Sequence, residues 1–415
     1  MRRPNRRPNY TETEDITNWE IPPDYLIYKD DADTVAVNGS TGEEDSRNTD
    51  SSTVIQYAID QITSGKGIIQ CKGSFTLAAE IILDDNITLQ GGTFTRGIGL
   101  TTNMFNIDDK SYVTLQNMEI DGDSKNCDYG ITVHYSTQLR LFNLTIKDFD
   151  KSGIYLDGTG GLCAFERGVQ IDHVHVTGCD SVDGTGLLLD IARYDYHVIT
   201  NSTFGYNYTG VYLHFGSNIY FDNCKFNGND HYGICVADRT YMNNCSANHN
   251  GEIGVFFHSS TDCAIDNSDV MRNENEGIAA YLTSNIAIRN SYIASNGQTG
   301  ATDHDSEIRL NQAINTCVSN CYLGFQGYAI LYGIYIFAGC YDTILNDNHI
   351  ETATTPINDL GSRTMVNHTA TESANAETPQ LAWPTGTIVD FTDSGDASGD
   401  GVYILAKDGN WMQLA

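Results

Sequence analysis

The sequence predicts an all-β chain folded as a parallel β-helix, a solenoid in which short strands stack coil upon coil. Two repeats carry this prediction. A glycine followed by alternating apolar residues recurs mostly at intervals of 21 to 24 residues, at Gly130, Gly153, Gly186, Gly210, Gly233, Gly254, Gly277 and Gly333. A second repeat places an asparagine shortly before a large apolar residue, at Asn117, Asn143, Asn201, Asn223 and Asn290. Two short strands per period, with Asn and Gly at the corners, are typical of a β-solenoid.

The N-terminal part is expected to lead into the solenoid and to close its end. Residues 1–24 are polar and aperiodic, which predicts a flexible arm or attachment segment. Residues 25–66 start with an alternating stretch at 25–37, which predicts a strand or hairpin. Asp50 then precedes apolar residues at helical spacing, which predicts a short amphipathic helix that covers the open end of the solenoid.

Residues 67–351 carry the β pattern. Leucine-rich repeats have a similar period, but these repeats contain no Leu-rich consensus and no helical stretch. Residues 352–380 are rich in Thr and Ala, and we expect a linker there. In residues 381–415 two apolar stretches flank an Asp/Gly loop, which predicts a small C-terminal β module.

Composition excludes several classes of function. The chain has 415 residues with 23 basic and 54 acidic side chains, a formal net charge of -31. Nucleic-acid binding is excluded, because it requires Lys and Arg to displace phosphate counterions. We expect no membrane span, since no apolar run reaches roughly 18 residues, and no secretory signal at the basic residues 1–8. The eleven cysteines, an odd number, predict buried thiols rather than a disulfide framework. No cofactor and no metal site are predicted.

A candidate site follows from the alternation of side chains along a strand. The fourth residue after each repeat glycine points outward, so His134, Asp157, Asp190 and His214 are expected to form one column, bordered by Tyr155 and Tyr212. Carboxylates on coils about 4.8 Å apart would differ in pKa and could act as acid and as base or nucleophile, as glycoside hydrolysis requires. The alternative is that these side chains are ordinary solvated surface.

Long connections follow both carboxylates and strengthen this candidate. Residues 158–168 follow Asp157 and residues 191–197 follow Asp190. Loops on a rigid scaffold often carry binding residues, and an acidic sugar could be bound here by Arg167, Arg193, Tyr194 and Tyr196, with Glu166 as a further substrate-binding residue. A lyase would need a base and a cation, for which His214 and Arg193 are the candidates. We therefore predict Asp157, Asp190 and His214 as catalytic and the other named side chains as substrate-binding.

The capping helix at residues 52–62, the two repeats and the segment Ile-Thr-Leu-Gln-Gly-Gly at residues 87–92 resemble the pectate-lyase-like superfamily of single-stranded right-handed β-helix proteins. The resemblance covers about residues 50–350. It implies a right-handed solenoid, and the superfamily includes lyases, polygalacturonases, epimerases and virus tailspikes. The Asp-Pro-His run of alginate epimerases, the pectate-lyase calcium cluster and the polygalacturonase motifs are absent.

Within that superfamily the chain looks most like a viral tailspike or receptor-binding protein. The resemblance implies a location on the virion surface or outside the cell, a host surface polysaccharide as ligand and substrate, contact with other virion or tail proteins through the N-terminal arm, and a homotrimer. Two alternatives stay open: a free polysaccharide lyase or glycoside hydrolase, and a structural or adhesive β-helix without catalysis.

Overall fold

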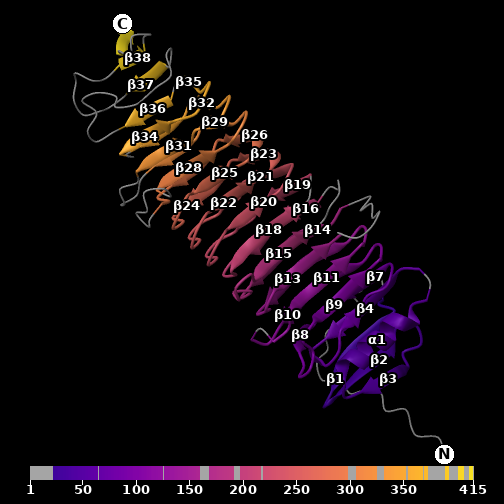
Figure 1. Ribbon diagram of the computed structural model, residues 1–415. Helices are drawn as coiled ribbons and strands as arrows, with labels where there is room; N and C mark the ends of the chain where they lie inside the picture. Colours follow the sequence, from indigo (N-terminus) through magenta and orange to yellow (C-terminus); the bar gives the residue numbers. More distant parts are fainter. Residues whose placement is uncertain are drawn as a thin grey trace, which may run out of the picture.

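The computed structural model describes residues 22–63, 65–124, 126–158, 168–190, 197–215, 218–297, 305–324, 331–351, 354–367, 369–372, 388–391, 401–405 and 411–414. These residues form an elongated stack of strands between the two termini (Figure 1). One helix, α1 (Ser51–Gln61), lies at the N-terminal end of the described chain. The architecture confirms the predicted parallel β-helix with a capping helix.

A twelve-stranded sheet forms one face of the solenoid, and its strands pair in parallel from each coil to the next. Along the chain its strands are β6 (Ile81–Ile82), β9 (Asn103–Asp108), β11 (Tyr129–His134), β13 (Ser152–Asp157), β15 (Thr185–Asp190), β18 (Thr209–Phe215), β20 (Ile234–Val236), β22 (Val255–His258), β25 (Ile278–Tyr281), β28 (Ser306–Asn311), β31 (Tyr332–Ile336) and β34 (Thr355–Asp359).

A nineteen-stranded sheet forms a second face. Its parallel stack consists of β4 (Gly67–Lys72), β7 (Ile87–Gln90), β10 (Thr114–Asp121), β12 (Arg140–Lys147), β14 (Gln170–Thr177), β16 (His197–Thr200), β19 (Ile219–Asp222), β21 (Thr240–Asn243), β23 (Thr261–Asp266), β26 (Ser284–Arg289), β29 (Cys317–Ser319), β32 (Ile344–Asn346) and β35 (Met365–Asn367). The sheet also includes β1 (Tyr25–Asp30), β2 (Asp33–Asn38), β3 (Glu44–Asn48), β5 (Ser74–Leu77), β8 (Thr93–Arg96) and β17 (Thr203–Phe204).

An eight-stranded sheet completes the C-terminal half. It contains β24 (Asp269–Met271), β27 (Tyr292–Ala294), β30 (Tyr322–Gly324), β33 (His349–Glu351), β36 (Thr369–Glu372), β37 (Ile388–Phe391), β38 (Gly401–Leu405) and β39 (Trp411–Leu414). The last three strands pair antiparallel, and β37 also pairs in parallel with β36.

The solenoid extends beyond its predicted end. β34, β35 and β36 pair in parallel with β31, β32 and β33, so strands occupy part of the segment expected to be a linker at 352–380. The pairing of Ile334 with Ile357 places Pro356 opposite Gly333. Because this coil lacks the glycine of the repeat, its sequence did not match the pattern.

The repeat glycines mark places where neighbouring coils approach closely. A Cβ atom on Gly130 would lie 2.5 Å from the carbonyl oxygen of Gly153 and 3.0 Å from a methyl group of Ile146. No side chain fits there without displacing the next coil. The repeated glycine therefore marks the positions at which neighbouring coils pack too closely for a side chain.

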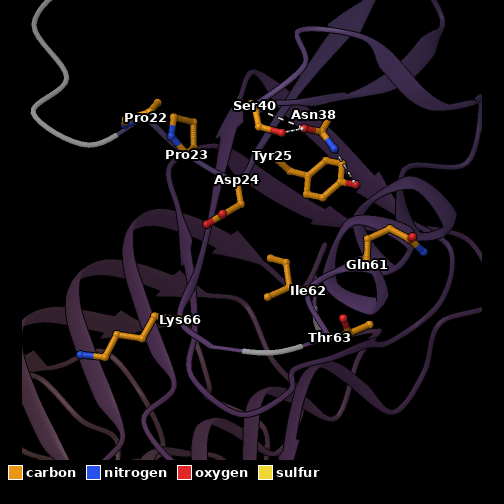
Figure 2. Close-up of a pocket in the computed structure, with 11 residues that line it drawn as sticks. Pro22, Pro23, Asp24, Tyr25, Asn38, Ser40, Gln61, Ile62, Thr63 and Lys66 are labelled. Carbon is orange, nitrogen blue, oxygen red and sulfur yellow. Dashed lines mark hydrogen bonds between the residues drawn. The ribbon is translucent and has the colours of Figure 1, made fainter.

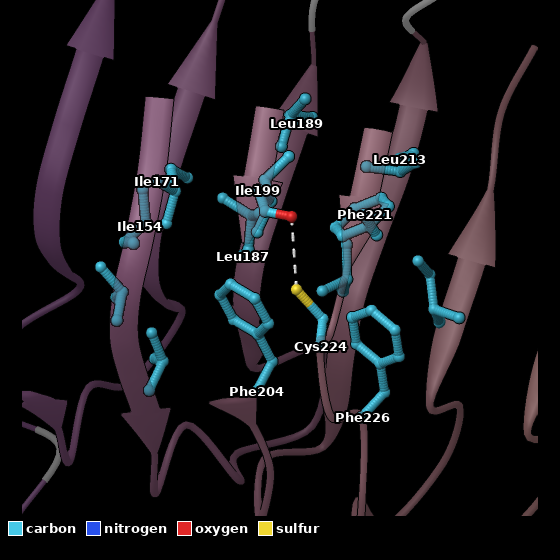
Figure 3. Packing of buried hydrophobic residues seen from close by; sticks show 14 of the residues in the cluster. Ile154, Ile171, Leu187, Leu189, Ile199, Phe204, Leu213, Phe221, Cys224 and Phe226 are labelled. Atoms are coloured by element: carbon cyan, nitrogen blue, oxygen red, sulfur yellow. Dashed lines mark hydrogen bonds between the residues drawn. The ribbon is translucent and has the colours of Figure 1, made fainter. Parts of the chain in front are cut away.

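The interior is a continuous apolar core built from the inward residues of each strand. Phe204, Phe221 and Phe226 pack inside successive coils (Figure 3), with the rings of Phe221 and Phe226 edge to face at 5.4 Å between centroids. The thiol of Cys224 donates to the carbonyl oxygen of Ile199 at 3.4 Å. The cysteines of the described residues are free thiols, and all but Cys317 are buried, which confirms the prediction for them.

The N-terminal end is closed by α1 and a hairpin. The carboxylate of Asp50 caps α1 by accepting a hydrogen bond from the Ser52 amide at 3.0 Å, and Val54, Ile55, Ala58 and Ile59 are buried. Strands β1 and β2 pair antiparallel, and β1 also pairs in parallel with β4. No helix in the described part of the chain is long and apolar enough to cross a membrane.

A cavity of about 380 Å³ lies between the hairpin and the end of α1. Tyr25, Asn38 and Ser40 line one side of it (Figure 2). The Tyr25 hydroxyl donates to Asp45 at 2.8 Å, and burial together with this carboxylate raises the pKa of Tyr25 to about 12. Asp24 accepts a hydrogen bond from the Ile68 amide at 2.7 Å. These polar groups serve to join the cap to the first coil.

Candidate functional site

The predicted column lies on the outer face of the twelve-stranded sheet. Strand pairing places Asp108, His134, Asp157 and Asp190 opposite one another on β9, β11, β13 and β15. Their strand neighbours Val133, Leu156 and Leu189 are buried. Since side chains alternate along a strand, the column faces outward.

The first pair in the column joins His134 and Asp157. Nδ1 of His134 lies 3.2 Å from Oδ2 of Asp157. The two side chains are 30% and 17% exposed, so both are accessible from solvent yet partly covered. The carboxylate therefore orients the imidazole ring with one nitrogen facing the aspartate.

The second pair joins Asp190 and His214, although their backbones are not level. A register shift between Leu189 and Asp190 places Asp190 opposite Phe215. His214 is thus displaced by one residue from the predicted column, because β18 carries an extra residue at this irregularity. Its side chain still reaches back, and Nδ1 lies 3.2 Å from Oδ1 of Asp190.

The two carboxylates are neighbours, and each contacts a histidine on its far side. Asp157 and Asp190 occupy paired positions on adjacent strands, where backbones are about 4.8 Å apart. We call this set of four side chains, His134, Asp157, Asp190 and His214, the His–Asp cluster. It contains two imidazoles that are each held by a carboxylate, which is an arrangement suited to proton transfer.

Aromatic rings lie beside the His–Asp cluster. Tyr155 stacks on Tyr129 with 5.2 Å between ring centroids and meets His134 edge-on at 6.1 Å. Burial, followed by the charges of Asp157 and Asp190, raises the pKa of Tyr155 to about 12. The Tyr212 ring lies 6.2 Å from that of His214. Both predicted tyrosines therefore border the cluster. Tyr155 contributes a phenol that stays protonated at neutral pH, and Tyr212 contributes an aromatic face.

A cation lies at the other edge of this surface. The Lys151 ammonium is 5.5 Å from the centre of the Tyr129 ring and 2.7 Å from Oδ2 of Asp128. The hydrogen bond to Asp128 raises the pKa of Lys151. Going across the sheet, the surface changes from a charged edge, through two stacked tyrosines, to the His–Asp cluster.

Further aromatic side chains continue along the same sheet toward the C-terminus. Phe256 lies between Tyr232 and His258, at 5.2 and 5.4 Å between centroids, and His258 stacks on Tyr281 at 5.7 Å. The face that carries the cluster is thus bordered by rings over several coils.

Some predicted residues lie outside the described part of the chain. These are Glu166, Arg167, Arg193, Tyr194 and Tyr196, so their substrate-binding role stays a prediction. The catalytic roles of Asp157, Asp190 and His214 stay predictions as well. Among the described residues, no group of three or more His, Cys, Asp and Glu side chains is arranged to hold a metal ion.

Three residues of this surface were missed in the sequence. Asp108 extends the column, but Met104 stands opposite Gly130, so the repeat signature is absent from its coil. Tyr129 precedes the repeat glycine, and Lys151 precedes the next glycine by two residues. A tyrosine stands directly before the repeat glycine at Tyr129, Tyr232 and Tyr332. This recurrence could have pointed to Tyr129 in the sequence.

Comparison with known proteins identifies the architecture. Residues 185–350, less than half of the chain, match the family model for a right handed beta helix region. No curated protein matches the chain by sequence.

Solved structures with the same fold carry different functions. The A-module of Azotobacter vinelandii mannuronan C-5 epimerase AlgE6 has a TM-score of 0.68 and 17% identity, over 78% of this chain and 95% of that one. The Dettilon tailspike protein has a TM-score of 0.58 and 11% identity, over 85% and 72%. PfbA, a surface adhesin of Streptococcus pneumoniae, has a TM-score of 0.51 and 14% identity, over 88% and 96%. The parallel strand register and these matches together show that the chain is a right-handed parallel β-helix.

Proposed function

We propose that this chain binds an acidic polysaccharide on the outer face of the twelve-stranded sheet and acts on it at the His–Asp cluster. The observation that carries the proposal is a pair of carboxylates on neighbouring coils, each 3.2 Å from an imidazole, next to Tyr155 and Tyr212. Aromatic side chains supply the apolar faces on which sugar rings stack. A carbohydrate ligand is also supported by the name of a similar structure, mannuronan C-5 epimerase.

The chemistry that fits this cluster is removal of a proton next to a uronate carboxylate. His214 is the base in this proposal, because its side chain is 52% exposed against 30% for His134. With Nδ1 held by Asp190, Nε2 would take the proton, and Asp190 would stabilise the resulting imidazolium. Hydrolysis by two carboxylates is less favoured, since each carboxylate already contacts a histidine.

In an elimination, the C5 proton would pass to His214 and its electron pair would form the C4=C5 double bond as the C4–O4 bond breaks. Tyr212, whose ring lies 6.2 Å from that of His214, would give a proton to the departing oxygen, because His134 is three coils away from the base. Return of a proton to the opposite face of C5 would instead give an epimer. A cation must neutralise the uronate carboxylate, and Arg193 and Arg167 are the candidates, because they follow the two aspartates in the sequence.

We further propose that this activity belongs to a virion-associated tailspike at the virion surface, which would use it on a host surface polysaccharide. The fold shared with the Dettilon tailspike protein over 85% of this chain supports this assignment. The surface adhesin PfbA shares the fold as well, so a purely adhesive protein is the alternative to be tested.

The test incubates the purified chain in D₂O with uronate-containing and neutral polysaccharides. Elimination produces new reducing ends together with the absorbance of unsaturated uronates, and epimerisation incorporates deuterium at C5 without cleavage. Either result supports proton removal. Reducing ends without that absorbance would contradict proton removal and indicate hydrolysis, and binding without any product would indicate an adhesive protein.

Matched variants locate the activity on the surface. His214→Ala and Asp190→Asn should each lower the rate at least about 100-fold, the usual contribution of an acid or base. His173 offers a control, because it forms a similar contact, 3.0 Å from Asp172, on a different sheet. His173→Ala should leave the rate unchanged. Full activity in Asp157→Asn together with Asp190→Asn would show that the cluster is not the site.

A further inference from the structure

Three consecutive strands of the twelve-stranded sheet carry no charged residue. β20, β22 and β25 follow β18 along the solenoid (Figure 1), and none of the three contains Asp, Glu, Lys or Arg. The strands before β18 bring Asp157 and Asp190, and the strand after β25 brings Arg309. The His–Asp cluster is therefore followed, on the same face, by an uncharged stretch.

Aromatic rings occupy this uncharged stretch. Phe256 lies between Tyr232 and His258, and the His258 ring stacks on Tyr281. We call these four side chains the aromatic patch. His258 is exposed and the other three are half-buried, so all four reach solvent. Surface rings of this kind supply the flat apolar faces on which sugar rings stack.

The neighbours of Phe256 along the solenoid are small. Strand pairing places Cys235 on one side of it and Ala279 on the other, and each of the two is only 5% exposed. Because both side chains are shorter than a phenyl ring, Phe256 projects beyond them. A ligand that runs along the axis from the His–Asp cluster therefore contacts Phe256.

The charges that border the aromatic patch do not suit an acidic sugar. Glu252 contacts His231 at 3.1 Å, and the His231 ring lies 3.6 Å from the Tyr232 ring, measured between centroids. Arg309, on the next strand, contacts the buried Glu276 at 2.7 Å. Within the part of this stretch that the structure describes, a sugar carboxylate would thus meet a second carboxylate at one edge and an arginine already paired at the end.

We propose that the aromatic patch binds uncharged sugar units of a polysaccharide whose uronate unit lies at the His–Asp cluster. The inference rests on the proposed function and narrows its substrate to a mixed polymer, in which uronates are interspersed with uncharged sugars. A uronate at the patch would be repelled by Glu252, whereas an uncharged sugar can stack on the rings. Three steps of about 4.8 Å separate β18 from β25, about 14 Å in all, so the patch accommodates a short segment of the polymer.

Calorimetric binding to the full chain tests this proposal, with His214→Ala present to block turnover. The mixed polymers are hyaluronan, chondroitin and gellan, and the polymers made of uronate alone are polygalacturonate and alginate. The best mixed polymer should bind at least about tenfold more tightly than either all-uronate polymer. Phe256→Ala should weaken the binding of the mixed polymer about tenfold through the lost ring contact. Phe142→Ala is the matched control, because this ring is 41% exposed on a different sheet.

His258→Lys supplies a second test at an exposed position, where the substitution does not endanger folding. The added cation should raise the affinity for the all-uronate polymers several-fold. Three results would overturn the proposal: all-uronate polymers that bind the parent chain as tightly as the mixed ones, no binding of any mixed polymer, or an equal loss in Phe142→Ala.

Binding and turnover separate this inference from the proposed function. If mixed polymers bind at the aromatic patch but the chain with His214 intact forms no product, the proposed chemistry fails and the patch stands. If that chain removes protons from an all-uronate polymer that it binds as tightly as a mixed one, the inference about the patch fails alone.

Discussion

At the scale of single residues, the most unusual side chain is Glu307, a carboxylic acid buried in the core. The pairing of Ile278 with Ile308 places it opposite the repeat glycine Gly277, and it is 1% exposed. Asn296 donates to Oε2 from its backbone and side-chain nitrogens. Among the described residues, no partner contacts Oε1. Burial therefore raises the pKa of Glu307 well above its usual value.

Glu307→Gln should abolish the fall in the free energy of unfolding that the buried carboxyl group causes as the pH rises. The folded state favours the protonated acid, so its contribution to stability is complete below the unfolded pKa, near 4.3, and is lost as the pH rises through the raised pKa. Thermal unfolding from acidic to alkaline pH should show the unsubstituted chain losing stability relative to the Gln variant. The loss should be about 1.4 kcal/mol for each pH unit that separates the unfolded pKa from the folded pKa.

The control for this experiment is the exposed Glu43. Glu43→Gln should unfold in parallel with the unsubstituted chain at every pH. If the curve for Glu307→Gln also stays parallel, the buried carboxyl does not titrate as its surroundings indicate.

At the scale of structural elements, a ladder of buried asparagines connects neighbouring coils. The backbone amides of Asn207, Asn229, Asn250 and Asn273 each donate to the side-chain oxygen of the next asparagine, at 3.0 to 3.1 Å. The ladder continues to Asn296 and ends on Glu307. It satisfies backbone groups at a turn inside the core, where water is excluded, and so holds the coils in register.

Asn250→Ala should destabilise the chain by about 1 to 3 kcal/mol, the cost of a buried polar group without a partner. The substitution removes the acceptor of the Asn229 backbone amide, whereas the Asn229 side-chain nitrogen keeps its hydrogen bond to the carbonyl oxygen of Phe204. Chemical denaturation measures the change. Asn243, whose side chain donates to Asp222 on the surface, is the control, and Asn243→Ala should cost less than about 1 kcal/mol. If both variants lost the same free energy of unfolding, the buried asparagine ladder would stabilise the chain no more than the exposed hydrogen bond of Asn243 does.

At the scale of the whole molecule, the dominant property is its negative charge. If all 23 basic side chains were paired, 31 of the 54 carboxylates would still have no cation. Repulsion of this kind opposes the compact state and is screened by salt.

Raising NaCl from about 10 mM to about 0.5 M should increase the unfolding temperature, because the Debye length falls from about 30 Å to below 10 Å. Exposed ion pairs such as Arg363 with Asp342 weaken at the same time, but each contributes only about 0 to 1 kcal/mol. Differential scanning calorimetry with KCl as a second salt separates screening from a specific ion effect. A constant or falling unfolding temperature would contradict the expectation.

The sequence by itself determined the β-helix, its capping helix and the outward column. It could do so because close coil contacts admit only glycine, as at Gly130, and because alternation assigns each side chain to a face. Coils without that glycine, such as those of Met104 and Pro356, escaped the pattern.

Only the tertiary structure decided which side chains meet. The irregularity at Asp190 moves His214 by one residue yet leaves its ring against the carboxylate. The pairing of each aspartate with a histidine and the position of the buried Glu307 opposite Gly277 both join residues from different coils. A repeat specifies how each coil folds, but side-chain contacts depend on the register between coils, which insertions and bulges shift.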